Sequence, residues 1–335
     1  KMFPEYVYAG FYLYQLNASF MPETIVHIRE YLYSFTEEDN RKSGEKQFDY
    51  VDPKNREVQE EMESACTVYL KYLGAFLKKK PLKVKFKKEG FPCEASVIIP
   101  VRNRVRTIED AIRSVFRQQT NFDFNLIIVD NHSTDGTTEV IQQYAEDKRL
   151  IHLIPERDDL GIGGCWNEAA GHPSCGKFCV QLDSDDVYSG PDTLQKIVDA
   201  FYAESCAMVI GTYKMTDFDL NEIAPGIIDH REWTEENGRN NALRINGLGA
   251  PRAFYTPILR ELKMPNVSYG EDYAIGLAIS RIYRIGRIYD VLYLCRRWED
   301  NTDAALDIRK TNEHNAYKDS IRAIELGTRR TLNQK

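Results

Sequence analysis

Short runs of apolar residues alternate with segments of helical spacing from residue 95 onward. Each run ends in polar or acidic residues. Apolar runs of this length, separated by helices, are typical of strands buried in a parallel sheet. The sequence therefore predicts an α/β fold with strands over residues 96–99, 125–129, 150–154, 177–182 and 207–213.

Helices are predicted between these strands because apolar residues recur there at intervals of three and four. The first helix follows Thr107, which forms a variant of the capping box with Asp110. A second helix covers residues 137–146. Gly161-Ile-Gly-Gly164 opens a short third helix, and Pro191 suits the first turn of a fourth.

The alternation weakens after about residue 214. Residues 217–246 are polar and predict a loop. An extended segment over 249–254, a helix that begins near Tyr269 and a strand over 285–295 follow.

Residues 56–78 show helical spacing, and the tail from Asp303 has a charged composition typical of helices. We therefore predict a mainly helical N-terminal extension over residues 1–90 and a helical C-terminal tail over residues 303–335. The α/β domain lies between them, over residues 91–302.

Polar side chains follow three of the predicted strands. In parallel sheets ligands bind outside the carboxyl ends of the strands. We therefore expect Asn103, Asp130, Asp183 and Asp185 to converge on one crevice. Three acids in one crevice require a cation, or a ligand that carries hydroxyl groups.

Asp183 and Asp185 are two residues apart at a strand end, so their side chains are expected to point the same way. Two carboxylates on one side can hold a hard divalent cation such as Mg²⁺. The alternative is a solvated acidic turn. Asp130 likewise fits either hydrogen bonds to a base or ribose, or an acid that closes a turn. His132 suggests a dyad with Asp130, but the turn composition explains it.

Glu271 and Asp272 precede a predicted helix. An acid there can cap the helix, while the other faces the crevice as a general base. Arg296, Arg297 and Trp298 form a polar turn. They could meet a departing diphosphate or a sugar face, or form a surface turn.

Composition narrows the classes of function. A net charge of -7 and a pI near 5.6 argue against nucleic acid as the main partner. The seven cysteines form no C-x-x-C pair, which favours neither a zinc site nor a disulfide framework and fits a reducing cytosol. No apolar run is long enough to span a membrane, and the start lacks the pattern of a signal peptide.

Lysines are concentrated between Lys78 and Lys88. This connector fits a solvated linker. It also fits a patch that meets anionic lipid head groups, since such patches need several clustered cations.

Five segments together resemble the family 2 glycosyltransferases of the GT-A fold, across residues 94–302. They occur in the family's order and spacing. The segments are Ser96-Val-Ile-Ile-Pro-Val-Arg-Asn103, Ile128-Val-Asp-Asn-His-Ser-Thr-Asp-Gly136, Gly163–Ala170, Leu182-Asp-Ser-Asp-Asp186 and Gly270-Glu-Asp272. The resemblance implies a Rossmann-like, mixed, mostly parallel sheet flanked by helices.

The resemblance also implies site residues. Asp183 and Asp185 would hold Mn²⁺ or Mg²⁺, with Asp183 also near the ribose. Asp272 would be the general base and Glu271 its rival. The nucleotide sugar would be bound by Pro100, Val101, Asn103, Asp130, Asn167, Asp183 and Arg297.

The resemblance thus implies an inverting, metal-dependent, hexosyltransferase-like enzyme of bacterial polysaccharide biosynthesis. A UDP-sugar is the favoured donor, and a glycan or lipid-linked glycan is the acceptor. We expect this enzyme in the cytoplasm, either free or bound peripherally to the inner face of the membrane. The alternatives are a sugar nucleotidyltransferase and a non-catalytic protein that binds nucleotide sugars.

Overall fold

The computed structural model describes residues 55–298 and 308–334, apart from residues 232, 235 and 246, together with the single residues 7, 26 and 30. The chain divides into two compact units. The larger comprises residues 79–230 and 246–325, and the smaller comprises residues 1–78, 231–245 and 326–335. Most of the predicted N-terminal extension, over residues 1–54, lies outside the described residues, and the predicted domain boundaries stay a prediction.

The larger unit is built on a nine-stranded sheet with the order β3-β2-β1-β4-β8-β6-β9-β5, and β7 pairs with β6. Its first four strands are parallel. These strands are β3 (Leu150–Leu153), β2 (Phe124–Asp130), β1 (Ala95–Val101) and β4 (Phe178–Gln181).

The other half of the sheet is mixed. Strand β8 is antiparallel to β4 and β6, whereas β6 and β9 are parallel. The strands are β8 (Arg252–Tyr255), β6 (Met208–Thr216), β9 (Ile285–Arg296), β5 (Val187–Tyr188) and β7 (Glu222–Ile228). The predicted mixed sheet flanked by helices is therefore confirmed.

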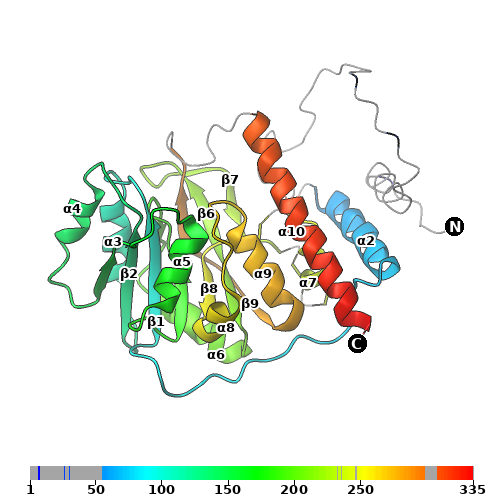
Figure 1. The fold of residues 1–335 in the computed structure, drawn as a ribbon, viewed down its shortest axis with the longest axis horizontal. Helices are drawn as coiled ribbons and strands as arrows, with labels where there is room; N and C mark the ends of the chain where they lie inside the picture. Colours follow the sequence, from blue (N-terminus) through cyan, green and yellow to red (C-terminus); the bar gives the residue numbers. More distant parts are fainter. Residues whose placement is uncertain are drawn as a thin grey trace. The chain divides into compact units, whose positions relative to one another are not determined.

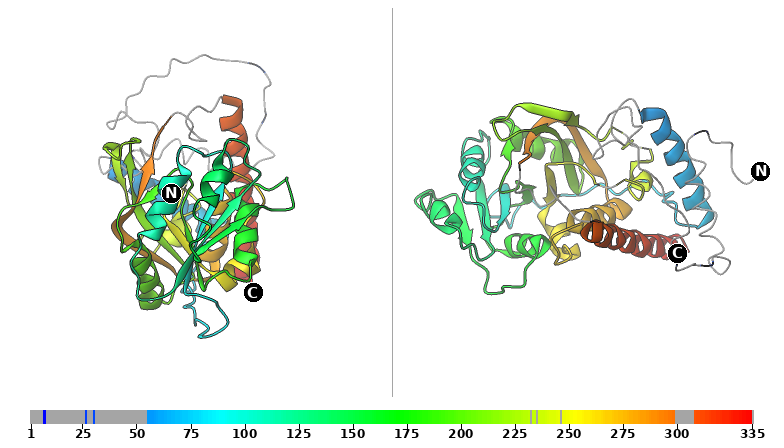
Figure 2. Two further views of the ribbon diagram at one scale, coloured as in Figure 1. Left: turned by 90° about the vertical axis from the view of Figure 1, so that its left-hand side faces the viewer. Right: turned by 90° about the horizontal axis from the view of Figure 1, so that it is seen from above.

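Helices flank this sheet (Figures 1 and 2). In the view of Figure 1, α5 and α9 lie in front of the strands, while α6 packs against β6 and β9. None of the described helices is long and apolar enough to cross a membrane. The helices are α3 (Ile108–Phe116), α4 (Thr137–Gln142), α5 (Ile162–Gly171), α6 (Thr193–Glu204), α8 (Thr256–Leu262), α9 (Glu271–Ile282) and α10 (Ile308–Gln334).

The smaller unit contains α2 (Arg56–Tyr72) and the short α7 (Gly238–Asn241), which pack together. The side chain of Asn237 donates a hydrogen bond to Glu63 in α2, at 2.8 Å. Asn240 accepts one from the backbone of Leu77, at 2.9 Å. Polar side chains thus join segments that are far apart in the sequence.

Two predictions of local structure are wrong. Residues 217–246 contain β7 and α7 rather than a loop alone. Strand β7 pairs through its backbone with β6 and leaves most of its side chains at least partly exposed, so it needs no apolar run. The capping box does not form either, because Thr107 makes no capping bond and the carboxylate of Asp110 instead accepts from Arg296, at 2.7 Å.

The glycines at the start of α5 allow a loop to approach the helix closely. A Cβ atom on Gly163 would lie 1.9 Å from the carbonyl oxygen of Pro265, and one on Gly164 would lie 2.2 Å from Oδ1 of Asn266. The backbone N–H of Gly163 also donates to the carbonyl of Val267, at 3.0 Å. Residues 264–268 are therefore fixed on α5 immediately before α9 begins.

We predict that Gly163→Ala destabilises the fold. Its Cβ would overlap a backbone carbonyl, which cannot swing away as a flexible side chain can, and overpacking costs about 1–3 kcal/mol or more. Urea denaturation would measure the loss. Gly171→Ala, at the other end of α5, is the matched control because nothing lies within 4 Å of its Cβ position. Equal midpoints for the two variants would contradict this account of the packing.

Candidate functional site

A cavity of about 460 Å³ opens at the carboxyl ends of the parallel strands. It is bounded by the end of β1, the turn after β4, the start of β8 and the loop before α9. Seven of the ten predicted site residues line it. They are Pro100, Val101, Asp183, Asp185, Glu271, Asp272 and Arg297.

The acidic residues 183–186 lie in a turn, because β4 ends at Gln181. The expectation that strand alternation aligns Asp183 and Asp185 is therefore wrong, although both line the cavity. The side-chain amide of Gln181 donates to both carboxylate oxygens of Asp183, at 3.0 Å each. Burial raises the pKa of Asp183, against the lowering effect of Arg252.

Arg296 holds this turn from behind. Its backbone N–H donates to Asp186 at 2.7 Å, its Nε donates to the carbonyl of Asp185, and its Nη1 contacts Asp110 at 2.7 Å. Arg296 is only 2% exposed. It is thus a structural brace rather than a residue that faces the cavity, whereas the next residue, Arg297, lines the cavity.

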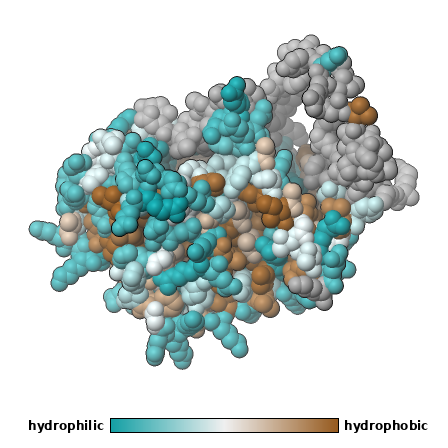
Figure 3. All heavy atoms as spheres, viewed as in Figure 1, coloured by the Kyte–Doolittle hydropathy of each residue, from teal (hydrophilic) through white to brown (hydrophobic). Residues whose placement is uncertain are grey.

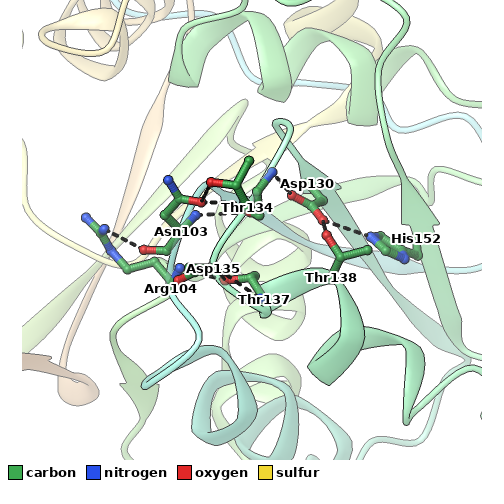
Figure 4. Close-up of polar contacts among 9 residues, drawn as sticks. Asn103, Arg104, Asp130, Thr134, Asp135, Thr137, Thr138 and His152 are labelled. Carbon is green, nitrogen blue, oxygen red and sulfur yellow. Dashed lines mark hydrogen bonds and ion pairs between the residues drawn. The ribbon is translucent and has the colours of Figure 1, made fainter.

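Asn103 and Asp130 do not line the cavity. Asp130 is fully buried and accepts hydrogen bonds from the backbone of Ser133, at 3.0 Å, and from the Thr138 hydroxyl (Figure 4). Burial raises the pKa of Asp130, but its polar neighbours, which include the His152 ring at 3.5 Å and the hydrogen-bonding Ser133 and Thr138, bring that pKa well below its usual range.

The side chain of Asn103 accepts a hydrogen bond from the backbone of Thr134, at 2.8 Å (Figure 4). Together with Asp130 it closes the loop that follows β2, as the turn interpretation of Asp130 predicts. The neighbour of Asp130, Asn131, lines the cavity instead. Its Nδ2 donates to the carbonyl of Leu160 at 2.8 Å, and its Oδ1 has no hydrogen-bond partner among the described residues.

Asn167 lines a second cavity of about 420 Å³, on the other side of α5. Its amide makes two hydrogen bonds with the backbone of Met264. Nδ2 donates to the carbonyl at 2.8 Å, and Oδ1 accepts from the N–H at 2.9 Å. Asn167 therefore secures the start of the 264–268 loop.

Glu271 and Asp272 both line the cavity, but their surroundings differ. The N-cap of α9 is Gly270, and Oδ1 of Asp272 accepts a hydrogen bond from the backbone N–H of Tyr273 in the first turn, at 2.7 Å. Asp272 forms an ion pair with Nη1 of Arg252, at 2.8 Å. Glu271 is 9% exposed and its Oε2 has no partner among the described residues. Burial, together with the charge of Asp272, raises the pKa of Glu271 to about 8.

Arg252 is a site residue that the sequence analysis did not identify. Its Nη1 also donates to the carbonyl of Gly249, at 2.8 Å, and its backbone N–H donates to Gln181, at 3.1 Å. Through Gln181 it is linked to Asp183. A charged residue inside an apolar extended segment, Gly249-Ala-Pro-Arg-Ala-Phe254, was the available signal.

Helix α10 packs over the start of α9, which carries the two acids. His314 stacks on Tyr269 with ring centroids 3.8 Å apart. The ammonium of Lys318 lies 4.7 Å from the centre of the Tyr269 ring and 5.7 Å from that of Tyr273. Tyr317 lies against Gly270. The tail thus forms part of the environment of Glu271 and Asp272.

Comparison with known proteins identifies the family. Residues 96–260 match the model of glycosyl transferase family 2. The chain is similar to a putative teichuronic acid biosynthesis glycosyltransferase, TuaG of Bacillus subtilis, with 29% identity across 55% of this chain and 71% of the relative. It is also similar to a poly(ribitol-phosphate) beta-glucosyltransferase of Bacillus spizizenii, with 22% identity across 69% of this chain and 36% of the relative.

Among solved structures, residues 1–349 of TarS from S. aureus in complex with UDP-GlcNAc share the fold. The TM-score is 0.54 and the identity 20%, over 70% of this chain and 71% of that one. The order of motifs, the mixed sheet and the family match agree. The chain therefore belongs, through residues 96–260, to family 2 of the glycosyltransferases.

Proposed function

We propose that this glycosyltransferase moves a sugar from a nucleotide-diphosphate donor to a hydroxyl group of a glycan or lipid-linked glycan, with inversion at the anomeric carbon. One observation carries the proposal. A single cavity is lined by the end of β1, by the acids Asp183 and Asp185, and by the pair Glu271 and Asp272. The donor, the charge of its leaving group and a base can therefore meet in one place.

The relatives favour a UDP-sugar and polysaccharide synthesis. TarS was crystallised with UDP-GlcNAc, and TuaG is assigned to teichuronic acid biosynthesis. In this chain, Pro100 and Val101 line the cavity at the end of β1, where the nucleotide would lie. Asn131, whose Oδ1 has no partner among the described residues, supplies a polar group beside them.

Asp185 and Asp183 are suited to hold a divalent cation. Among the described residues, no group of three or more His, Cys, Asp or Glu side chains is placed to hold a metal ion. This fits Mg²⁺ or Mn²⁺, which takes one or two carboxylates and completes its shell with water and phosphate oxygens. When bound, such a cation offsets the charge that develops on a departing diphosphate. Arg297, at the same cavity, can add a planar cation for phosphate.

Asp272 is better suited than Glu271 to be the general base. Because burial raises the pKa of Glu271 to about 8, most of it carries a proton at neutral pH and only the smaller ionised fraction can accept one. The ion pair with Arg252 fixes the Asp272 carboxylate at the cavity wall. A base must lie within about 3 Å of the hydroxyl that it activates, so a fixed carboxylate is an advantage.

Metal-dependent nucleotide binding is the first test. A thermal-shift panel of UDP, GDP, CDP and dTDP, each with and without Mn²⁺, should give a shift with one nucleotide that requires the metal. Asp185→Ala should abolish the metal requirement and most of the shift. Asp219→Ala, an exposed acid outside the cavity, serves as the control. An unchanged response to manganese in Asp185→Ala would exclude Asp185 as a metal ligand.

The base is tested by transfer activity. Asp272→Asn should lower the rate of transfer by roughly a hundredfold to ten-thousandfold, the usual contribution of a general base, while the nucleotide shift is kept. Glu271→Gln replaces the neighbouring acid by its amide, at a position where the acid is mostly uncharged at neutral pH, and should retain far more activity. The reverse order of the two variants would assign the base to Glu271.

Glu271 should also make stability depend on pH. The folded chain keeps its proton up to about pH 8, while the unfolded chain releases it near the ordinary value of 4.5. The unfolded chain therefore binds fewer protons between these values, and the free energy of unfolding falls by roughly 1 kcal/mol per pH unit as the pH rises through this window.

Urea denaturation at several pH values would measure this dependence. Glu271→Gln should remove the slope between about pH 5 and pH 8, and Glu261→Gln, an exposed acid, should keep it. An unchanged slope in Glu271→Gln would show that other groups produce it.

A further inference from the structure

A segment rich in lysine precedes β1. Residues 79–88, here the basic strap, contain six lysines and no acid, although the chain as a whole carries a net charge of -7. Nothing in the proposed transfer reaction uses these residues. In the structure, backbone hydrogen bonds and the ring of Phe86 hold the strap in place on the larger unit.

Backbone hydrogen bonds fix the strap on the larger unit. The N–H of Leu82 donates to the carbonyl of Ile282 at 2.8 Å, and the carbonyl of Leu82 accepts from Arg284 at 3.0 Å. The N–H of Val84 donates to the carbonyl of Ser205, at 2.7 Å. The strap is therefore held in an extended conformation along the unit.

Phe86 anchors the strap. Its ring lies edge-on to Phe178, Phe201, Tyr202 and Tyr255, with centroid distances of 5.3, 6.3, 5.4 and 5.1 Å. Such edge-to-face pairs of rings are each worth about 0.5–1.5 kcal/mol beyond the area that they bury. This contact fixes which side of the strap faces the protein.

The lysines lie on the other side. Side chains of an extended segment alternate, so Lys83, Lys85 and Lys87 point away from the side on which Val84 and Phe86 are partly buried. All three side chains are exposed. At the usual rise per residue of an extended chain, successive lysines of this set are about 7 Å apart. Five lysines form no ion pair with any described residue. They are Lys80, Lys83, Lys85, Lys87 and Lys88.

Two acids close to the strap do not cancel this charge, because they already pair with other cations, and Glu89, which follows the strap, is one exposed acid beside six lysines. Glu204, next to the residue that binds Val84, contacts Arg284 at 3.2 Å. Glu94, which contacts Tyr202 beside Phe86, pairs with Lys177 at 3.1 Å. The strap is therefore a fixed row of positive charge.

The strap lies at the amino ends of the strands, whereas the cavity lies at the carboxyl ends of the parallel strands. Phe86 packs on Phe178, the first residue of β4, whereas the cavity begins beyond the last residue of that strand. Figure 1 draws the strap in cyan along the lower edge of the molecule, and Figure 3 shows hydrophilic side chains that project from this edge.

We propose that the basic strap binds the surface of an anionic phospholipid bilayer. Clustered lysines are attracted to such a surface. Leu82 lies on the same side of the strap as Val84 and Phe86 but stays 57% exposed, so an apolar side chain borders the row of lysines. Such a border suits the boundary between head groups and acyl chains better than a polyanion dissolved in water. The strap thus provides peripheral attachment, with the cavity facing away from the lipid.

Vesicle co-sedimentation of the full chain tests the proposal. The protein should sediment with vesicles of phosphatidylglycerol and phosphatidylcholine, should not sediment with phosphatidylcholine alone, and should be released by high salt. The triple variant Lys83→Gln, Lys85→Gln and Lys87→Gln should bind roughly a hundredfold more weakly, since each lysine near an anionic surface contributes about fivefold.

A matched control variant tests whether vesicle binding depends on the lysines of the strap or on the total positive charge of the protein. Arg117→Gln, Lys148→Gln and Arg309→Gln remove three exposed positive charges elsewhere and should leave vesicle binding close to that of the unchanged chain. The nucleotide thermal shift should be the same in all three proteins, because none of these residues lines the cavity. Equal loss in both triple variants, or no binding by the unchanged chain, would overturn the proposal. Binding to soluble polyphosphate but not to vesicles would overturn it in favour of an anionic polymer.

Discussion

The ion pair between Arg252 and Asp272 links the two sides of the cavity. Several carboxylates lie within this partly buried space, and buried charges are tolerated only when they are paired. Although burial lowers the pKa of Arg252, the charges of Asp272, Asp183 and Glu271 raise it above its ordinary value, so the cation persists. Because Arg252 starts β8 and β8 pairs with β4, the sheet itself sets the distance between the acidic turn and the first turn of α9.

Two further contacts fix those two sides. Arg296, the last residue of β9, secures the acidic turn, although the two are far apart in the sequence. It also joins the turn to Asp110 in α3. The glycines of α5 and the amide of Asn167 secure the other side, since they seat the 264–268 loop. The cavity is thus defined by pairs of rigid elements rather than by free loops, which favours precise placement of reacting groups.

The sequence predicts the buried strands and most of the cavity well, because strand ends and their polar residues are local patterns. It fails where position depends on which way a side chain turns at a strand end. Asp130 turns inward to close a loop and Asn131 turns outward, and no periodicity separates these two outcomes. Arg252 was missed because its importance comes from partners 20 or more residues away. The glycines of α5 were recognised, but their close contact with residues 264–268 is a tertiary fact that the sequence alone does not contain.

The basic strap and the cavity lie at opposite ends of the strands, so the strand length sets the distance between them. Strand β1 is seven residues long, which at about 3.3 Å per residue places its two ends roughly 20 Å apart. An enzyme held on a bilayer through the strap would work at about that height above the lipid. A sugar acceptor close to its lipid anchor would be out of reach, whereas the free end of a longer chain would arrive at the cavity. The fold would then select acceptors by length as well as by chemistry.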